Sequence, residues 1–510
     1  MFTDAQTATS PYARRFAETI QRLAPRGVPE TALAAVRFAA ALVAHKTVVD
    51  KNVCADISAH PGLAEILASA DCAFAVSMAN ADDYRPLVLE DTRLYLRLYW
   101  SLENRLAEML KSRGNIFVVT GGPGTGKTTG IKKIVGEYVA ESERGLSVKL
   151  CAPTGKAATR MEEALPDFRA ETLHRLLGYQ PWDGAFKRNA ESPIDADILV
   201  VDEASMIDLP MMTALFGAVP ESCRVFLLGD KDQLAAVETG CVFADICDAW
   251  EGRGNLTRLT INHRSKEAPE VVALKDLVNA GKADEAWDYL VSQQDGSSLA
   301  LLSPTDKFVF EQGRKETADP EQNQNFHAFH FSLLKNNLSP AEALDEFNRF
   351  RILCATRDDT EEANDAVMRL LGVRMHGHGC PVMITENDYA TGLFNGDTGL
   401  CLNTPTDGMK VWFPPADASG AARPFAVSQL PAHEPCFAMT VHKSQGSGFD
   451  EVLLVLPDTP LPLLTRELLY TGITRARKRC VISASEAVFK TAVARRAHRA
   501  SGLTAKLKKV

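Results

Sequence analysis

The chain has 510 residues, of which 45% are hydrophobic, and a formal net charge of −9. That length exceeds what one hydrophobic core supports and predicts roughly three or four domains. The negative charge argues against a protein that coats nucleic acid non-specifically, but it leaves room for a local basic groove.

The cysteines and the apolar stretches indicate where the protein works. Eleven cysteines are scattered along the chain and form no Cys-x-x-Cys pair, so we expect reduced thiols in the cytoplasm and not a disulfide framework. No apolar stretch appears long enough in the sequence to suggest a membrane span, and the first residues lack the features of a signal peptide. We therefore expect no membrane partner.

The first half of the chain predicts helices followed by an α/β unit. Residues 14–95 favour helix, with 31–45 (TALAAVRFAAALVAH) the clearest amphipathic stretch, and a second helix is expected over 91–113. Apolar strands then alternate with helical segments, which indicates a parallel sheet flanked by helices. The strands are expected at 116–120, 148–152, 198–201 and 224–228.

A second α/β unit is expected beyond residue 255, with strands at 352–356, 451–456 and 479–483. Within it, residues 377–435 are rich in glycine, proline and short β-type runs, which favours a small inserted β-barrel or hairpin module. Residues 305–348 are polar and are assigned to helices plus a connection. The expected domains are 1–95, 96–255 and 256–510.

A glycine-rich loop predicts a nucleotide site. Residues 121–128 read GGPGTGKT, follow a predicted strand and open a helix. Backbone N–H groups of such a loop close around phosphates, with Lys127 on the β/γ-phosphates and Thr128 on Mg²⁺. A fortuitous glycine turn would not combine lysine, threonine and this context. The nucleotide-binding residues expected here are Gly121, Gly122, Pro123, Gly124, Thr125, Gly126, Lys127, Thr128 and Thr129.

Two carboxylates follow a later apolar strand. Residues 198–201 (ILVV) end in Asp202 and Glu203, and the carboxyl end of such a strand lies beside the phosphates in an open parallel sheet. We expect Asp202 to ligate Mg²⁺, directly or through water, and Glu203 to orient and deprotonate the attacking water. The pair acquires this meaning only together with the glycine loop.

Three further side chains are candidates for hydrolysis. Gln233 ends the run LLGDKDQ and is expected to hydrogen-bond the γ-phosphate or the water, an ordinary polar strand turn being the alternative. Arg264 (in NHR) and Arg475 (in YTGITRAR) lie in the second unit and are candidates to neutralise transition-state charge. If they reach across a cleft, hydrolysis is coupled to domain closure; alone, each is more often a surface residue.

Seven segments appear in the order of a known motif set, and together they resemble a superfamily 1B helicase. Within that group the chain resembles the RecD family, the alpha subunits of exodeoxyribonuclease V, over roughly residues 35–485, with long similar spans such as 381–399 (PVMITENDYATGLFNGDTG). The segments are GGPGTGKTT, APTGKAA, TLHRLLG, VVDEASMIDLP, LLGDKDQLAAVETG, MTVHKSQGSGFDEV and LLYTGITRAR.

The resemblance implies an α/β fold in which two RecA-like P-loop domains flank one ATP, with a helical N-terminal domain and a small SH3-like insertion, domain 2B. It implies an ATP- and Mg²⁺-dependent motor that moves 5′ to 3′ on single-stranded DNA. It also implies RecB-like and RecC-like partners in double-strand break processing, with the N-terminal domain docked on RecC and the nuclease in RecB.

The resemblance also carries DNA contacts onto eight positions. Hydroxyls, amides and lysines near strand ends can grip phosphates without reading sequence. For His174 and His442, a structural histidine remains the alternative reading. The eight positions are Thr154, Lys156, Thr172, His174, Thr440, His442, Lys443 and Gln445.

Two rival functions remain open at this point. No glutamine occurs between Tyr99-Trp100 and Gly121, where relatives carry an adenine-reading glutamine, and the stretch 264–351 is compressed. These departures motivate the alternative of a mainly structural subunit with an impaired motor, but the presence of the whole set of phosphate-site residues argues for the motor. A solitary superfamily 1B helicase is the other alternative, and it would unwind DNA without partners.

Overall fold

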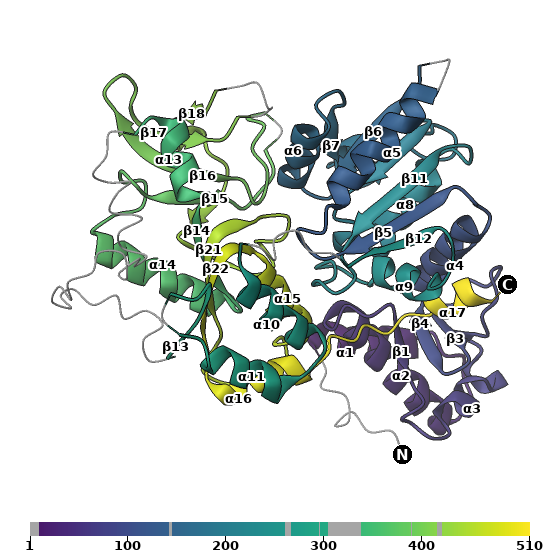
Figure 1. Ribbon diagram of the computed structural model, residues 1–510. Coiled ribbons are helices and arrows are strands. Elements are labelled where there is room, and N and C mark those ends of the chain that lie inside the picture. The colour runs from purple at the N-terminus through teal and green to yellow at the C-terminus, as the bar shows by residue number, and fades with distance from the viewer. Residues whose placement is uncertain are drawn as a thin grey trace.

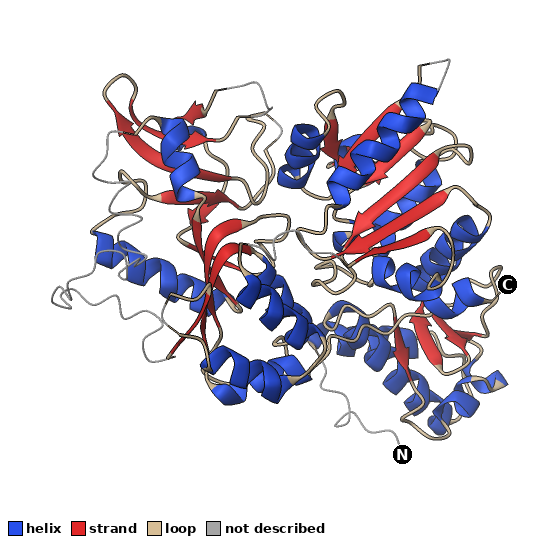
Figure 2. Cartoon of the chain, viewed as in Figure 1, coloured by secondary structure: helices blue, strands red, loops and turns tan. Residues whose placement is uncertain are grey.

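Two parallel sheets, side by side, form the centre of the molecule, with a smaller β module beside one and an N-terminal unit beside the other (Figures 1 and 2). The computed structural model describes residues 10–141, 145–260, 267–294, 296–303, 338–388, 390–415 and 421–509. Arg264 and most of the polar segment 305–348 lie outside these residues.

The first sheet has six parallel strands in the order β12-β5-β11-β10-β6-β7. All four predicted strands are present within one residue of their expected ends. The bounds are β5 (Ile116–Gly121), β6 (Val148–Ala152), β7 (Ala170–Thr172), β10 (Ile198–Val201), β11 (Arg224–Gly229) and β12 (Leu256–Leu259).

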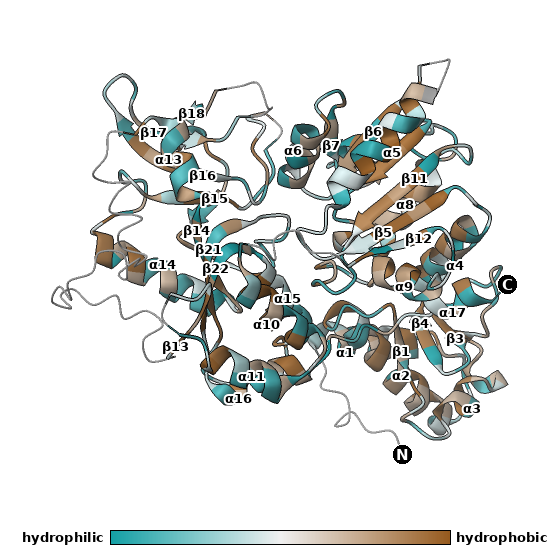
Figure 3. Cartoon of the chain, in the orientation of Figure 1, coloured by the Kyte–Doolittle hydropathy of each residue, from teal (hydrophilic) through white to brown (hydrophobic). Residues whose placement is uncertain are grey.

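Helices cover both faces of this sheet because its strands are apolar on both sides. Along β10, Ile198 and Val200 pack with α5 (Lys127–Glu141) and α6 (Gly155–Ala164), whereas Leu199 and Val201 point to the opposite core. Successive side chains of a strand alternate between faces, so a continuous apolar run requires two layers of helices. Figure 3 shows the resulting concentration of hydrophobic colour in these strands.

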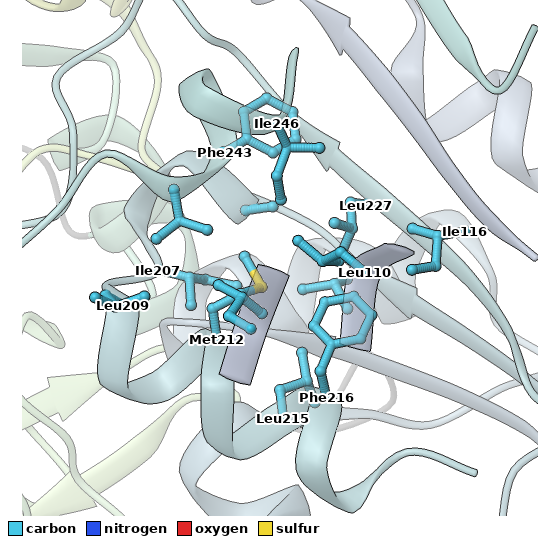
Figure 4. Packing of buried hydrophobic residues seen from close by; sticks show 14 of the residues in the cluster. Leu110, Ile116, Ile207, Leu209, Met212, Leu215, Phe216, Leu227, Phe243 and Ile246 are labelled. Atoms are coloured by element: carbon cyan, nitrogen blue, oxygen red, sulfur yellow. The ribbon is translucent and has the colours of Figure 1, made fainter. Parts of the chain in front are cut away.

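The opposite core is formed by α4 (Arg97–Lys111), α8 (Leu209–Ala218) and α9 (Val242–Ala249). Figure 4 shows Leu110, Phe216 and Phe243 from these three helices around Leu227 of β11. Burial of large side chains of this kind contributes about 1.5–3 kcal/mol each. This core fixes the strand ends that carry the glycine loop and Asp202.

The second sheet has five parallel strands in the order β13-β22-β21-β14-β20. Helices α10 (Pro269–Asn279), α11 (Ala283–Val291), α15 (Arg466–Thr474) and α16 (Glu486–Ala494) pack on one face, and α14 (Arg357–Leu371) packs on the other. The three predicted strands occur here, shifted by up to three residues. The bounds are β13 (Leu299–Leu302), β14 (Phe350–Cys354), β20 (Ala438–Thr440), β21 (Phe449–Val455) and β22 (Ala476–Ser483).

The segment expected as a small β module forms a five-stranded antiparallel sheet in the order β18-β17-β16-β15-β19. Helix α13 (Pro340–Phe347) packs on β16 and β17. An SH3-like closure of this sheet remains a prediction. The strands are β15 (Pro381–Ile384), β16 (Thr398–Thr404), β17 (Gly408–Phe413), β18 (Arg423–Phe425) and β19 (His433–Pro435).

The N-terminal unit combines the predicted helices with a sheet that the sequence analysis missed. Its helices are α1 (Pro11–Gln21), α2 (Glu30–Val48) and α3 (Leu63–Leu67). Residues 93–96 form β4 between two partner strands, so the helix expected from residue 91 begins at Arg97. The sheet order is β1-β4-β3-β2, with β1 (Cys54–Asp56), β2 (Val76–Ser77), β3 (Leu87–Glu90) and β4 (Arg93–Leu96).

Helix α2 corrects the expectation that no apolar stretch reaches membrane-spanning length. By length and composition it is the one helix in the described part of the chain that could cross a membrane. Its alanines are buried against α1 and the N-terminal sheet, and 56% of its most apolar window lies inside the protein. Close packing of an alanine-rich core helix accounts for its composition.

The C-terminal segment crosses from the second α/β unit back to the first (Figure 1). Helix α17 (Leu503–Lys508) packs on α4 and α9, and Leu503 and Leu507 join their core. The fully buried Glu103 of α4 accepts hydrogen bonds from the Tyr95 hydroxyl (3.1 Å), the Ser501 hydroxyl (3.0 Å) and the Gly502 N–H (2.9 Å). The Lys506 ammonium lies 3.5 Å from the same carboxylate.

Lys506 also pairs with Glu90, so it keeps a carboxylate partner when Glu103 is removed. We predict that Glu103→Ala lowers the free energy of unfolding by about 1–3 kcal/mol, because the Tyr95, Ser501 and Gly502 donors lose their buried acceptor. Urea unfolding followed by circular dichroism measures the loss. The control is Glu108→Ala on the exposed face of the same helix, expected to change stability by less than about 0.5 kcal/mol. Equal effects of the two substitutions would contradict the role given to Glu103.

Candidate functional site

The glycine loop lies between β5 and α5, at the carboxyl end of the first sheet. Gly124 and Gly126 adopt φ values of 82° and 80°, a region that residues with a Cβ rarely occupy. The Lys127 ammonium donates to the carbonyl oxygens of Gly121 (2.5 Å) and Gly122 (3.3 Å), folding back over the loop. The lysine is thus placed to exchange these carbonyls for phosphate oxygens.

The carboxylates lie at the same edge of the sheet, where β10 ends. The Glu203 N–H donates to Oδ1 of Asp202 at 2.8 Å. Burial and, after it, the neighbouring Glu203 charge raise the pKa of Asp202 to about 6, against the lowering effects of the Glu203 N–H, Lys127 and Arg160. Glu203 has a left-handed backbone (φ 50°), which turns the chain sharply after the strand. An added cation at this position would relieve the cost of the buried charge.

Gln233 and Arg475 meet across the interface between the two α/β units. Nη2 of Arg475 donates to Oε1 of Gln233 at 2.8 Å, and both side chains are buried, with exposures of 3% and 6%. Nη1 and Nε of the arginine donate to the carbonyl oxygens of Ser447 (2.9 Å) and Thr471 (3.2 Å). Burial lowers the pKa of Arg475, and the charges of Glu203 and Asp230 oppose that shift.

Two more bonds cross the same interface. The Leu234 N–H donates to the Thr471 hydroxyl at 2.9 Å, and Nε2 of Gln445 donates to the Leu234 carbonyl at 2.9 Å. The structure therefore brings Gln233 and Arg475 together, and it brings both beside the element that carries Glu203. Arg264, the other arginine candidate, lies outside the described residues.

The proposed DNA contacts of the first unit occupy helix starts. Thr154 and Thr172 cap α6 and α7 (Leu173–Leu176), accepting from the N–H groups of Ala157 and Arg175. The His174 ring packs edge-on against Tyr179 at 5.3 Å, and burial lowers its pKa.

Lys156 lies at the start of α6 and faces the second unit. Its ammonium is 5.8 Å from the centre of the Phe449 ring, a cation–π contact between the units. Burial and, after it, the charges of Arg160 and Arg351 lower the pKa of Lys156 to about 7, with Cys436 and Asp397 acting in the opposite direction. Arg160 also bonds the Gly446 carbonyl across the interface.

The proposed DNA contacts of the second unit lie on β20 and the turn after it. The Thr440 hydroxyl accepts from the Lys443 N–H at 3.3 Å, and the Lys443 ammonium pairs with Glu434 at 2.8 Å. Burial lowers the pKa of His442, and the charge of Arg499 lowers it further. Gln445 is buried in the interface with the first unit, where it bonds Leu234.

A cleft of about 460 Å³ separates the first unit from the β module. Lys156 and Arg160 line it from α6, Thr172 lines it from β7, and Phe394 and Arg423 line it from the module. Arg175 adds a fourth basic side chain to the lining, and four carboxylates also line the cleft, those of Glu162, Glu163, Glu171 and Asp397. The basic groups and the aromatic ring are of the kind that engages the phosphates and bases of a single-stranded nucleic acid. Two of the proposed DNA contacts, Lys156 and Thr172, therefore share this groove.

Several site residues were missed in the sequence. Asp230 and Tyr470 stand inside motifs that were recognised, but only Gln233 and Arg475 of those motifs were selected. Asp230 follows a strand that ends at the same edge as β10, which is the signal that identified Asp202. Arg160 and Phe394 gave no local signal, because the cleft exists only after the units are assembled.

Within the described residues, no group of three or more metal-binding side chains is assembled. This does not conflict with a magnesium role for Thr128 and Asp202. Mg²⁺ bound with a nucleotide takes one or two protein ligands, with phosphates and waters completing its shell. The raised pKa of the buried Asp202 carboxylate identifies a charge that such a cation would stabilise.

Comparisons with known proteins place the motifs in a family. A profile described as "AAA domain" matches residues 105–239, and one described as "UvrD-like helicase C-terminal domain" matches residues 435–483. The chain is 33% identical to RecBCD enzyme subunit RecD of Haemophilus influenzae, over 76% of this chain and 69% of that protein. It is 35% identical to the same subunit of Mycolicibacterium smegmatis, over 80% of this chain and 75% of that protein.

Other similar proteins match over a smaller share of their own length or at lower identity. The ATP-dependent RecD2 DNA helicase of Deinococcus radiodurans is 33% identical, over 74% of this chain and 48% of that protein. Among solved structures, Bacteroides Pif1 bound to single-stranded DNA matches with 19% identity and a TM-score of 0.44, covering 76% of this chain and 93% of that one.

We predict that affinity for single-stranded DNA falls as pH rises above about 7. Lys156 loses its proton through a pKa of about 7 in the free protein, whereas a bound phosphate favours the charged form, so binding takes up a proton. The affinity should fall by up to about tenfold per pH unit. Fluorescence anisotropy at constant ionic strength measures it.

Two matched variants test whether Lys156 causes the pH dependence of DNA binding. Lys156→Met should abolish this slope, and Lys132→Met, on the exposed face of α5, should retain it. A slope that survives in Lys156→Met would show that another group takes up the proton.

Proposed function

We propose that this chain, which belongs to the RecD family, is the ATP-dependent DNA helicase subunit of a RecBCD-type complex that processes double-strand breaks. The proposal includes 5′ to 3′ translocation on single-stranded DNA and RecB-like and RecC-like partners. One observation carries it: the buried hydrogen bond of Arg475 to Gln233 joins the two α/β units beside the glycine loop. Such a contact is what a motor needs if hydrolysis is to move one unit against the other.

The residues of the chain have separate tasks in ATP hydrolysis. Backbone N–H groups of the glycine loop hold the phosphates, and Lys127 leaves the loop carbonyls to bind them. Glu203 accepts the proton of the attacking water. Gln233 and Arg475 meet the charge that develops on the transferred phosphoryl group, since Gln233 follows β11 at the edge that carries the glycine loop and Arg475 bonds it there from the second unit.

We assign Mg²⁺ to Thr128 and Asp202. When bound, the ion supplies positive charge that neutralises the phosphate oxygens during transfer. The chain contributes a hydroxyl at the start of α5 and a buried carboxylate at the end of β10. Together these two groups would hold the ion beside the phosphates.

Movement requires the DNA contacts to lie on both units. Lys156 and Thr172 belong to the first unit, and Thr440 and Lys443 belong to the second. Opening and closing of the interface would then change the distance between the two sets of DNA contacts and move the strand along. These side chains would contact phosphates and not base edges, which suits a motor that works on any DNA sequence.

The remaining parts of the proposal concern location and assembly. All eleven cysteines are free, and ten are buried, which fits a reducing cytoplasm. The domain boundaries 1–95, 96–255 and 256–510 remain our proposal, with the first as the RecC-docking unit. The last residues contact all three regions, since the segment after α16 crosses to α4, α9 and β1.

The structural-subunit alternative is weakened by the interface. Gln233 and Arg475 are buried in mutual contact, and the Asp202 carboxylate at the end of β10 accepts a hydrogen bond from the Glu203 N–H. A subunit without a working motor has no chemical need for this set. The missing upstream glutamine bears on adenine selectivity and on the efficiency of nucleotide binding, whereas the phosphate end of the site keeps its lysine, threonine and aspartate.

We predict that Lys127→Gln abolishes ATP hydrolysis by the chain and leaves its fold intact, because the substitution removes the cation that binds the β/γ-phosphates. The ATPase rate is measured with and without single-stranded DNA, for the chain alone and after addition of RecB-like and RecC-like partners. Circular dichroism reports the fold. Lys132→Gln, on the exposed side of α5, is the control and should retain the wild-type rate.

The outcome separates the three functions. DNA stimulation that depends on partners supports the proposal, and robust unwinding by the chain alone supports a solitary helicase. No stimulation in any mixture, with an unaltered rate in Lys127→Gln, would support the structural subunit.

A further inference from the structure

The hydroxyl of Tyr470 lies at the point where the second unit touches the glycine loop. Tyr470 is part of α15 and is only 3% exposed. A Cβ added to Gly122 would lie 2.8 Å from the tyrosine hydroxyl oxygen, closer than real Cβ contacts occur. The absence of a side chain at Gly122 thus permits the tyrosine to touch the loop backbone directly.

The same hydroxyl holds a buried carboxylate. It donates to Oδ2 of Asp230 at 3.0 Å, and Asp230 is 2% exposed at the end of β11. A hydrogen bond to a buried charged group contributes more than a neutral one, because the carboxylate has lost its water. Tyr470 therefore links two parts of the first unit, the glycine loop and the end of β11.

Asp230 in turn positions Gln233. Nε2 of Gln233 donates to the Oδ2 atom that Tyr470 engages, at 3.1 Å, and this leaves Oε1 of Gln233 to accept from Arg475. An amide group has one donor end and one acceptor end, so the carboxylate fixes which end faces the arginine. Loss of the carboxylate would free the amide to turn over.

One helix, α15, carries both the tyrosine and the arginine of these contacts. Tyr470 lies in α15 and Arg475 is the residue that caps it. A shift of the helix therefore moves the hydroxyl and the guanidinium together. The glycine loop, Asp230, Gln233 and α15 form a continuous circuit of direct contacts across the interface.

We propose that Tyr470 is a positioning residue that transmits the state of the glycine loop to Arg475 through its contacts with Gly122 and Asp230. The proposal rests on the function assigned above and deepens it. Lys127 bonds the Gly122 carbonyl when it lies back on the loop. Phosphate binding draws Lys127 away, and the backbone of Gly122 is the part of the loop that touches Tyr470.

Substitution of Tyr470 should affect kcat and the KM for ATP differently. Tyr470→Phe keeps the ring and its packing but removes the hydroxyl, so binding of ATP should be preserved while the alignment of Gln233 and Arg475 is lost. We expect the DNA-stimulated kcat to fall by about 10- to 100-fold, with the KM for ATP within about threefold of wild type. Tyr289→Phe, on α11, is the matched control and should leave both values unchanged.

A second pair of variants tests the contact itself. Gly122 has a backbone conformation open to other residues, so Gly122→Ala adds a methyl group against the Tyr470 hydroxyl and should lower kcat. Removal of the hydroxyl makes space for the methyl group. Gly122→Ala combined with Tyr470→Phe should therefore lose less than the product of the two single effects.

These measurements use the assembled complex, and the rate of the Lys127→Gln complex is subtracted as the contribution of other motors. A tyrosine of merely structural importance would raise KM and lower thermal stability along with kcat. That combined change would overturn the proposal. An unchanged kcat in Tyr470→Phe would also overturn it, as would strictly multiplicative effects in the double variant. Failure of the proposed function would give a different result from failure of the Tyr470 proposal. The wild-type complex would then hydrolyse ATP no faster than the Lys127→Gln complex.

Discussion

The hydrogen bond from Arg475 to Gln233 is the interaction on which the rest of this structure depends. It joins a guanidinium capping a helix of the second unit to an amide at a strand end of the first. Both groups are buried, so each would be costly without the other. Thr471 and Gln445 of the second unit bond the backbone of Leu234, the residue after Gln233, and so hold the first unit beside this bond.

The interface is also where charge is concentrated. Asp230 and Arg475 are buried there and Asp202 and Lys156 are half-buried, and the loss of solvent shifts the pKa of each toward its neutral form. A site with so many desolvated charges is unfavourable as a passive scaffold and useful as a reaction centre. Phosphates and a cation would compensate these charges, so nucleotide and DNA binding should both stabilise the closed arrangement.

The sequence predicted the parallel sheets well because their strands are continuous apolar runs, as in 198–201 and 224–228. The glycine loop and Asp202 were found because their meaning depends on local order and strand context. The N-terminal sheet was missed because its strands are only two to four residues long, too short for a periodic signal. Tyr470, Asp230 and the cleft at Phe394 are defined by contacts between segments far apart in the chain, which single-sequence patterns do not encode.

The central claim is that nucleotide binding closes the two units through Arg475. Energy transfer between dyes at positions 132 and 459, exposed on the first and second units, measures this most directly. The account predicts that a non-hydrolysable ATP analogue changes the transfer efficiency in the wild type and not in Arg475→Ala, although the variant still binds the analogue. An identical change in Arg475→Ala, or no change in the wild type, would contradict it.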